Sequence, residues 1–413
     1  MKFYYFYFVV FLFFIGCSSK SRKESIDFFP AVSEVDVVNL ADLKFLDPLN
    51  LSDIAENIEY IPLETNTNAL IAHDGRRIHC SDSIIFIHES GKVMLFDRQG
   101  NFLQELFRVG QGPGECFAGM CDLNHKTREF YVYNLFRQKI EIYNFSGQHI
   151  KSIPNPTVNY YWPLSMGIYK DYILFDNNNF IPSFFSVFNI SNLDSAVYVY
   201  PNRYLKELKN RVAGFDSNSV CFQNKDSMLY FKEQFCDTLF YTTDFSVTCP
   251  RYIFDWGKTK TLDFQTFSKI FTREITDSHV EDGRYRIVSW MEVYPYLFFV
   301  IRTTIGGDFM QYLGIYNNNK KTLQITKDIE LNNDFDGGVN FIPLNPINNQ
   351  NFYKNQIYTL VYPYKLMEAY AQNKSYSSPQ RRKQLEKLVN SLSEDDNPIL
   401  MIVTIKNDDN NTN

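Results

Sequence analysis

A short phrase of strands and turns recurs along this chain and constrains its fold more than any other feature. Each copy joins runs of aromatic and β-branched residues, and turns at Gly100 and Gly147 close the two clearest copies. Equivalent positions in five copies are 47, 45, 52 and 76 residues apart: Leu95, Ile142, Val187, Leu239 and Ile315. Periods of about 40–50 residues with four strands per unit are typical of a β-propeller. We therefore expect an all-β fold of four-stranded antiparallel blades.

The composition supplies the side chains that such a fold must bury. The chain has 38 Phe and 28 Tyr, which is far more than a disordered chain carries. Because one blade cannot bury both of its faces alone, neighbouring blades must stack, and we expect the aromatic strands to fill those interfaces. The net charge of -6 comes from mixed charges, which argues against a nucleic-acid binder with its basic stripe.

Two segments depart from the strand pattern and predict short helical insertions. The wide spacing before Ile315 leaves room for a helix near 262–276, where most apolar residues have helical spacing. Residues 379–392 are the second candidate, with Ser378 as the cap and Pro379 at the first helical position. A strand at 398–405 follows. We place the propeller at 51–406 and a disordered tail at 407–413.

The first residues have the pattern of an export signal. The apolar run from Phe3 to Ile15 is too short to cross a hydrocarbon core of about 30 Å as a helix. The segment that ends at Gly16-Cys17 resembles a bacterial lipobox. We predict a signal peptide at 1–16, attachment to the membrane through a lipid anchor at Cys17, and a lipidated tether and lead-in at 17–50. An ordinary signal peptide with an incidental cysteine is the alternative.

Six cysteines follow Cys17, and an export compartment permits disulfides. Cys116 and Cys121 are close enough in sequence to pair, but buried cysteines also pack as small apolar residues. The chain has no CxxC motif, so a thiol-redox site or a zinc ribbon is not expected.

Several motifs together resemble a known family of propellers. They are Tyr60–Thr65, Leu95–Leu103, Arg108–Glu115, Ile142–Gly147 and Asn397–Leu400. These segments resemble the six-bladed β-propeller lipoproteins found in many copies in Bacteroidetes, which look like distant relatives of NHL-repeat and TolB-type propellers. The resemblance covers about residues 55–405 and implies a six-bladed β-propeller in the cell envelope. The chain departs from the family at Cys116, where an aromatic residue often stands. Most members have no assigned activity.

The charges after Cys17 bear on which side of the membrane the protein faces. Surface-exported lipoproteins of the Bacteroidetes resemble one another in an acidic run at this place. This chain has Lys20, Arg22 and Lys23 there instead. We therefore expect an outer-membrane lipoprotein and favour the periplasmic face over the cell surface.

Two glycine-containing segments look like ligand loops but are better explained as turns. The first contains Gly110, Gly112, Pro113 and Gly114; it lacks the Lys-Ser/Thr of a phosphate loop, and Pro113 has no N–H to donate. We interpret it as a turn between blades that requires positive φ at its glycines. The second, residues 334–338, lacks the spacing and the final Glu of a calcium loop.

No motif in the sequence indicates a metal, a cofactor or a catalytic centre. The six histidines form no HExxH motif, and there is no GxSxG motif. The best candidate ligand contacts are Tyr160, Tyr161 and Trp162, because Pro163 suggests a loop and flat rings stack on sugars. Ordinary packing in a blade core is the competing interpretation of these three residues.

Three functions are compatible with these observations. The first is a binding module of the cell envelope, without a catalytic motif, whose partner is a glycan, a peptide or an envelope protein. The second is a propeller enzyme, such as a glycan lyase, hydrolase or lactonase. That enzyme needs polar side chains with perturbed pKa values at the central channel. The third is a structural envelope component bound through blade edges.

Overall fold

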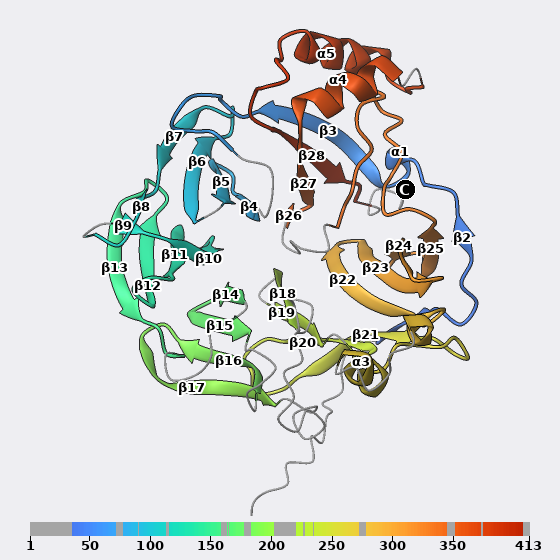
Figure 1. Ribbon diagram of the computed structural model, residues 1–413, viewed down its shortest axis with the longest axis horizontal. Helices are drawn as coiled ribbons and strands as arrows, with labels where there is room; N and C mark the ends of the chain where they lie inside the picture. Colours follow the sequence, from blue (N-terminus) through green and yellow to red (C-terminus); the bar gives the residue numbers. More distant parts are fainter. Residues whose placement is uncertain are drawn as a thin grey trace, which may run out of the picture.

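Six blades are arranged in a ring around a central axis in the computed structural model of the chain (Figure 1). The structure describes residues 35–407 except 72–76, 90, 113–114, 158–162, 164, 177–182, 202–219, 226–227, 234, 272–277, 345–351 and 373–374. The predicted fold class, a six-bladed propeller of four-stranded antiparallel blades, is confirmed. We number the blades along the chain.

In each blade, four strands lie side by side in order from the axis outward. Blade 1 consists of β4 (Arg77–Cys80), β5 (Ile84–Glu89), β6 (Lys92–Asp97) and β7 (Phe102–Glu105). Blade 2 consists of β10 (Ala118–Asn124), β11 (Glu129–Asn134), β12 (Lys139–Asn144) and β13 (His149–Pro154). Blade 3 consists of β14 (Ser165–Tyr169), β15 (Tyr172–Asp176), β16 (Ser183–Asn189) and β17 (Asn192–Pro201).

The second half of the ring has the same plan. Blade 4 consists of β18 (Val220–Lys225), β19 (Met228–Glu233), β20 (Thr238–Thr242) and β21 (Cys249–Asp255). Blade 5 consists of β22 (Arg286–Val293), β23 (Tyr296–Ile305), β24 (Asp308–Asn317) and β25 (Thr322–Thr326). Blade 6 consists of β26 (Phe352–Tyr353), β27 (Gln356–Val361), β28 (Ile399–Ile405) and β3 (Ala55–Pro62). A short parallel pair, β8 (Arg108–Val109) and β9 (Glu115–Cys116), joins blades 1 and 2.

The sequence pattern of each strand follows from its position in a blade. The second strand is covered on both faces by neighbouring blades, and β5 is accordingly buried at all six positions. The outermost strand meets solvent, and β13 is exposed at five of its six positions. This is why the inner strands appear in the sequence as nearly continuous apolar runs.

The ring closes by pairing the two ends of the propeller. Strand β3 lies antiparallel to β28, with Pro62 opposite Ile399 and Asn57 opposite Thr404. Because β3 is the outermost strand of blade 6, Pro62 lies on an edge, where a proline is tolerated. Gly100 has φ +89°, and a Cβ there would lie 2.0 Å from the carbonyl oxygen of Pro62, so glycine is required beside this edge.

The lead-in to the propeller contributes two strands that no sequence pattern predicts. Strand β1 (Asp36–Asn39) pairs in parallel with β21, and β2 (Phe45–Leu46) pairs in parallel with β25. They add a fifth strand to the outer edges of blades 4 and 5, as Figure 1 shows. We call β1 and β2 the strap. Its strands are only four and two residues long, and the spacing of their apolar residues does not distinguish them from a loop.

The helices lie between or beside blades. They are α1 (Leu51–Ile54), α3 (Phe264–Phe271), the 3₁₀ helix η1 (Ser278–Glu281), α4 (Pro363–Gln372) and α5 (Pro379–Val389). Helices α3 and α5 confirm the two predicted insertions. Helix α4 was not predicted, because only Pro363 and Leu366 of its residues are buried and the apolar stripe is short. In the described residues, no helix has the length and apolar character needed to cross a membrane.

Helix α5 begins at the predicted cap. The Ser378 hydroxyl accepts a hydrogen bond from the Arg381 backbone N–H at 3.4 Å, and Pro379 occupies the first turn. We expect Ser378→Ala to lower the free energy of unfolding by about 1 kcal/mol, because one N–H of the first turn loses its acceptor. Urea unfolding of both proteins measures this. Ser377→Ala, at the exposed position just before the cap, is the control, and an equal effect of both changes would contradict the cap.

The cysteines that the structure describes with their side chains are free thiols. They are Cys80, Cys116, Cys121, Cys236 and Cys249. The pairing of Cys116 with Cys121 that their spacing allowed is therefore absent, and both residues are buried in the core between blades 1 and 2. They pack there as small apolar side chains.

Candidate functional site

The first strand of each blade lies nearest the axis, and polar side chains gather there between blades 1 and 2. Three of them come from blade 1: Arg77 and His79 on β4, and His88 on β5. The fourth, Asp122, comes from β10 of blade 2. We call these four residues the inner seam site.

Strand geometry places the three residues of blade 1 on one face. Arg77 and His79 are two positions apart on β4, so their side chains point to the same side of the sheet. His88 lies directly opposite Arg77 in the β4–β5 ladder, and Phe86 lies directly opposite His79. Opposite residues in an antiparallel pair share a face, with Cβ atoms about 5 Å apart.

That face packs against blade 2. His88 donates from Nε2 to the carbonyl oxygen of Ala118 at 3.0 Å, and His79 Nδ1 lies 3.9 Å from Asp122 Oδ1. The rings of Phe86 and Phe130 stack at 4.8 Å, and His79 lies edge-on to Phe86 at 5.6 Å. The apolar contact between the blades therefore fixes both imidazoles.

Each histidine keeps one ring nitrogen without a partner in the described structure. His79 is 6% exposed and His88 7%. Among the residues that the structure describes, neither Nε2 of His79 nor Nδ1 of His88 has a hydrogen-bond partner. Buried polar atoms in native proteins are nearly always hydrogen-bonded, so two adjacent exceptions mark a place where a ligand or water is expected.

Arg77, on the same face of blade 1 as the two histidines, brings a positive charge to the site. It is half-buried, and no acceptor in the described part of the chain contacts its guanidinium group. Burial is the largest cause that lowers the pKa of His79 to about 3, and the charge of Arg77 is the second. Burial also lowers the pKa of His88 to about 4, with Arg77 again contributing. Both imidazoles are therefore neutral near pH 7.

Asp122 lies on the other side of the His79 ring. Burial raises its pKa to about 6, although the backbone N–H groups of Ile168 and Leu123 favour the carboxylate. These two hydrogen bonds are 2.7 and 2.8 Å long. They connect Asp122 to blade 3 and to its own strand, so its oxygens are held away from Nε2 of His79.

A second group of polar residues connects three blades at one end of the axis. Asp82, in the turn after β4, accepts from the Tyr353 hydroxyl at 3.1 Å and from Lys354 Nζ at 2.8 Å. The His125 ring, in the turn after β10, stacks on Tyr353 at 4.8 Å. The turns after the first strands all lie at the same end of the ring. Arg77 begins β4 and lies toward the opposite end.

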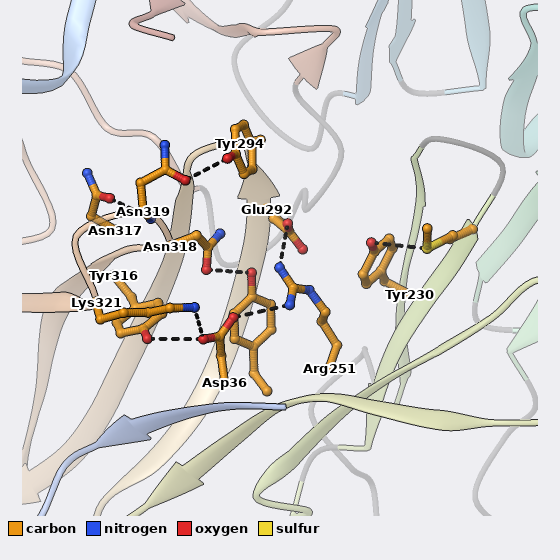
Figure 2. Close-up of polar contacts among 12 residues, drawn as sticks. Asp36, Tyr230, Arg251, Glu292, Tyr294, Tyr316, Asn317, Asn318, Asn319 and Lys321 are labelled. Carbon is orange, nitrogen blue, oxygen red and sulfur yellow. Dashed lines mark hydrogen bonds and ion pairs between the residues drawn. The ribbon is translucent and has the colours of Figure 1, made fainter. Parts of the chain in front are cut away.

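A third cluster, which we call the Arg251 cluster, fixes the strap between blades 4 and 5 (Figure 2). Asp36 of β1 accepts from Arg251 Nη1 at 3.1 Å, from the Tyr316 hydroxyl at 3.4 Å and from Lys321 Nζ. Nη2 of Arg251 lies 3.7 Å from Glu292 Oε1. Two carboxylates thus balance two cations, and we assign this cluster a structural role.

Neighbouring aromatic residues enclose the same cluster. The guanidinium of Arg251 lies 4.6 Å from the ring centre of Tyr252, whose hydroxyl donates to Asn318 Oδ1 at 2.9 Å. Burial, followed by the charge of Asp36, raises the pKa of Tyr316 to about 12. Burial likewise raises the pKa of Tyr252. Both tyrosines therefore remain neutral donors at physiological pH.

Several residues that the sequence singled out lie outside the described residues. These are Cys17, Pro113, Gly114, Tyr160, Tyr161 and Trp162. Lipid attachment and the aromatic ligand contacts therefore stay predictions.

The two described glycines of the predicted interblade turn correct one expectation. Gly110 and Gly112 do not have positive φ; a Cβ at Gly110 would lie 2.0 Å from Glu115 Oε2, and one at Gly112 2.9 Å. The Gly112 N–H donates to the same oxygen at 2.7 Å. A side chain at either glycine would displace the carboxylate of Glu115, which folds back onto the loop.

The segment 334–338 has neighbours that explain its acidic residues without a calcium ion. Asp334 accepts from the backbone N–H of Ser52 at 2.9 Å, and Asp336 accepts from Asn333 and from Gly338 at 2.9 Å each. No group of three or more metal-ligating side chains occurs in the described part of the chain.

The inner seam site is not apparent in the sequence. His88 appears there only as the end of a strand, and no motif connects it with His79 or Arg77. The alternation of Arg77 and His79 was the available signal, but β4 is only four residues long. The contact with blade 2 depends on how the blades stack, and the residue pattern of a single strand does not show this.

Comparisons with other proteins agree with this architecture. Residues 35–404 match the model of a family described as a domain of unknown function, DUF4934. No curated protein matches the chain. A crystal structure of a Bacteroides fragilis protein described as exported is similar, with 14% identity and a TM-score of 0.67 over 91% of this chain and 100% of that one. A DUF4221 member from Bacteroides vulgatus has 12% identity and a TM-score of 0.50, over 85% and 97%. At these identities the likeness shows the fold alone.

Proposed function

The chain belongs to the DUF4934 family, and from that premise we propose that it is a lipid-anchored binding module of the bacterial cell envelope. The inner seam site carries the proposal. Two buried imidazole nitrogens and a half-buried guanidinium lack partners in the described residues, so a bound molecule would satisfy them. Contacts at the interface between blades hold the two imidazoles in place before a ligand arrives, which reduces the entropy cost of binding.

The location rests on the N-terminal sequence. The apolar run that ends at Cys17 supports export and lipid attachment, and one propeller of similar fold is described as exported. We further propose the periplasmic face of the outer membrane, because Lys20, Arg22 and Lys23 follow the cysteine. A relationship to NHL-repeat and TolB-type propellers is part of the same proposal.

We expect Cys17→Ser to move the protein from the membrane fraction to the soluble fraction, because several acyl chains are lost together. Fractionation of cells that express each form, followed by mass spectrometry of the N-terminus, measures this. Ser18→Ala is the matched control and should remain with membranes. An unmodified Cys17 in the wild-type protein would refute the anchor without touching the binding proposal.

Binding can be tested on the imidazoles themselves. The chain has six histidines, so selective ¹³C labelling gives few resonances, and His79→Gln and His88→Gln assign two of them. We expect at least one compound from a panel of sugars, dipeptides and small anions to shift both resonances saturably. His149, on the outer strand β13, is the internal control. A panel that shifts neither resonance contradicts binding at this site.

A further inference from the structure

The inner seam site carries a positive charge that its described neighbours do not neutralise. Arg77 projects from the first strand of blade 1 on the same face as His79 and His88. In the described part of the chain it makes no ion pair, whereas the other two polar clusters at the seams of this ring balance their charges internally. A partly desolvated guanidinium without a carboxylate partner favours an anion.

The imidazole nitrogens extend the same recognition surface. The Ala118 carbonyl can only accept, so Nε2 of His88 holds the hydrogen and Nδ1 is an acceptor in the neutral ring. Nε2 of His79 is a donor in one of the two neutral tautomers. The three groups therefore offer a guanidinium fork, one N–H and one acceptor, which complement an oxyanion that also bears a hydroxyl group.

The nearby carboxylate is beyond hydrogen-bond distance of the His79 ring, so it does not hold the hydrogen on Nδ1, and a bound anion can select the tautomer with the hydrogen on Nε2. Asp122 lies on the Nδ1 side of the His79 imidazole at 3.9 Å, and the backbone N–H groups of Ile168 and Leu123 hold it there. Nε2 is on the opposite side of the ring. His125, the other titratable group close enough to influence His79, extends from the turn at the far end of β10.

From this geometry we infer that the inner seam site binds a small oxyanion, either a carboxylate or a phosphate group, through Arg77 and Nε2 of His79. His88 accepts a hydroxyl hydrogen of the same ligand. The inference rests on the proposed binding function and specifies its ligand chemistry.

The test uses minimal probes on the histidine-labelled mature chain with Cys17→Ser. Acetate and acetamide have nearly the same shape and differ in charge, so they isolate the contribution of the anion. Inorganic phosphate is the third probe and separates the two sources of the oxyanion. We expect acetate or phosphate, or both, to shift the His79 resonance saturably at millimolar concentration, and acetamide to leave it unchanged. Phosphate carries a hydroxyl group and should shift the His88 resonance as well, whereas acetate has none. A stronger response of His79 to phosphate than to acetate assigns the phosphate class, and the reverse assigns the carboxylate class.

Variants of Arg77 complete the experiment. Arg77→Met should weaken binding of the active probe about tenfold, the loss expected for one charge-assisted hydrogen bond. Arg77→Lys keeps the charge and should recover part of the affinity. Lys151→Met, on the outer strand β13, removes a charge far from the site and should have no effect. Far-ultraviolet circular dichroism shows whether each variant folds.

Three results would overturn the inference. They are a shift by acetamide equal to that by acetate, anion binding that Arg77→Met leaves unchanged, and no response to either anion. A neutral compound of the larger panel that shifts both histidines equally in the wild type and in Arg77→Met would support the binding function while refuting the oxyanion. The two failures are therefore distinguishable.

Discussion

Replacing Phe298 by alanine is expected to lower the free energy of unfolding by about 4 kcal/mol. Phe298 lies on β23, is fully buried, and belongs to the core between blades 5 and 6 together with Ile357 and Met401. Truncation removes a ring from a close-packed interface, and the surrounding strands cannot collapse into the space without disturbing their ladders. Chemical unfolding monitored by circular dichroism measures the difference.

The same hairpin provides a matched control. Phe309 lies on β24, the partner strand, and is 69% exposed. Phe309→Ala removes the same atoms from the same hairpin without opening a cavity, so the unfolding midpoint should hardly change. If the two alanine variants unfold at the same midpoint, the assignment of Phe298 to an interblade core is wrong.

The second large effect is expected at the strap. Arg251→Met should lower the free energy of unfolding by about 3 kcal/mol, because it removes one cation from two buried carboxylates. Asp36 keeps Lys321 and Tyr316 as donors, which places the expected loss at the lower end for a broken buried pair. Hydrogen exchange should also accelerate at residues 36–39, since the contacts of Asp36 add to the ladder with β21 in attaching β1 to the ring.

A second ion pair, just after the strap, serves as the control. Asp47 and Lys327 also connect the lead-in to a blade, at 2.8 Å, but both side chains are mostly exposed. Solvent and salt screen such a pair, so Lys327→Met should not change stability measurably. Equal losses for both variants would show that burial of the Arg251 cluster is not what stabilises the strap.

Some site features could not have been predicted, and the reason is physical. The contacts of His79 with Asp122 and of Phe86 with Phe130 join residues of different blades. Which residues meet there depends on the stacking of two sheets, and a strand of four residues such as β4 has too little pattern to show which face is buried. The histidines were visible in the sequence, but their shared face was not.

The strap, too, could not have been predicted from the sequence. Strand β2 is two residues long, and it pairs in parallel with β25, so the sequence contains no hairpin turn that would indicate this strand. Its position is set by the outer edge of blade 5, which exists only once the strands of that blade have paired. The glycines of the 110–112 loop are a related case, because their close neighbour is the side chain of Glu115 and their φ is not positive.

The sequence by itself determined the class of this protein. Its repeat spacing, apolar inner strands, edge proline at Pro62 and capped helix at Ser378 all act through local geometry or periodicity, which the linear chain expresses directly. Tertiary structure alone decided which side chains face one another across the seams. It placed Arg77 beside two imidazoles whose nitrogens are unsatisfied among the described residues, and it attached the strap through Asp36. Those contacts depend on the stacking of neighbouring blades, and the candidate ligand site is a product of that stacking.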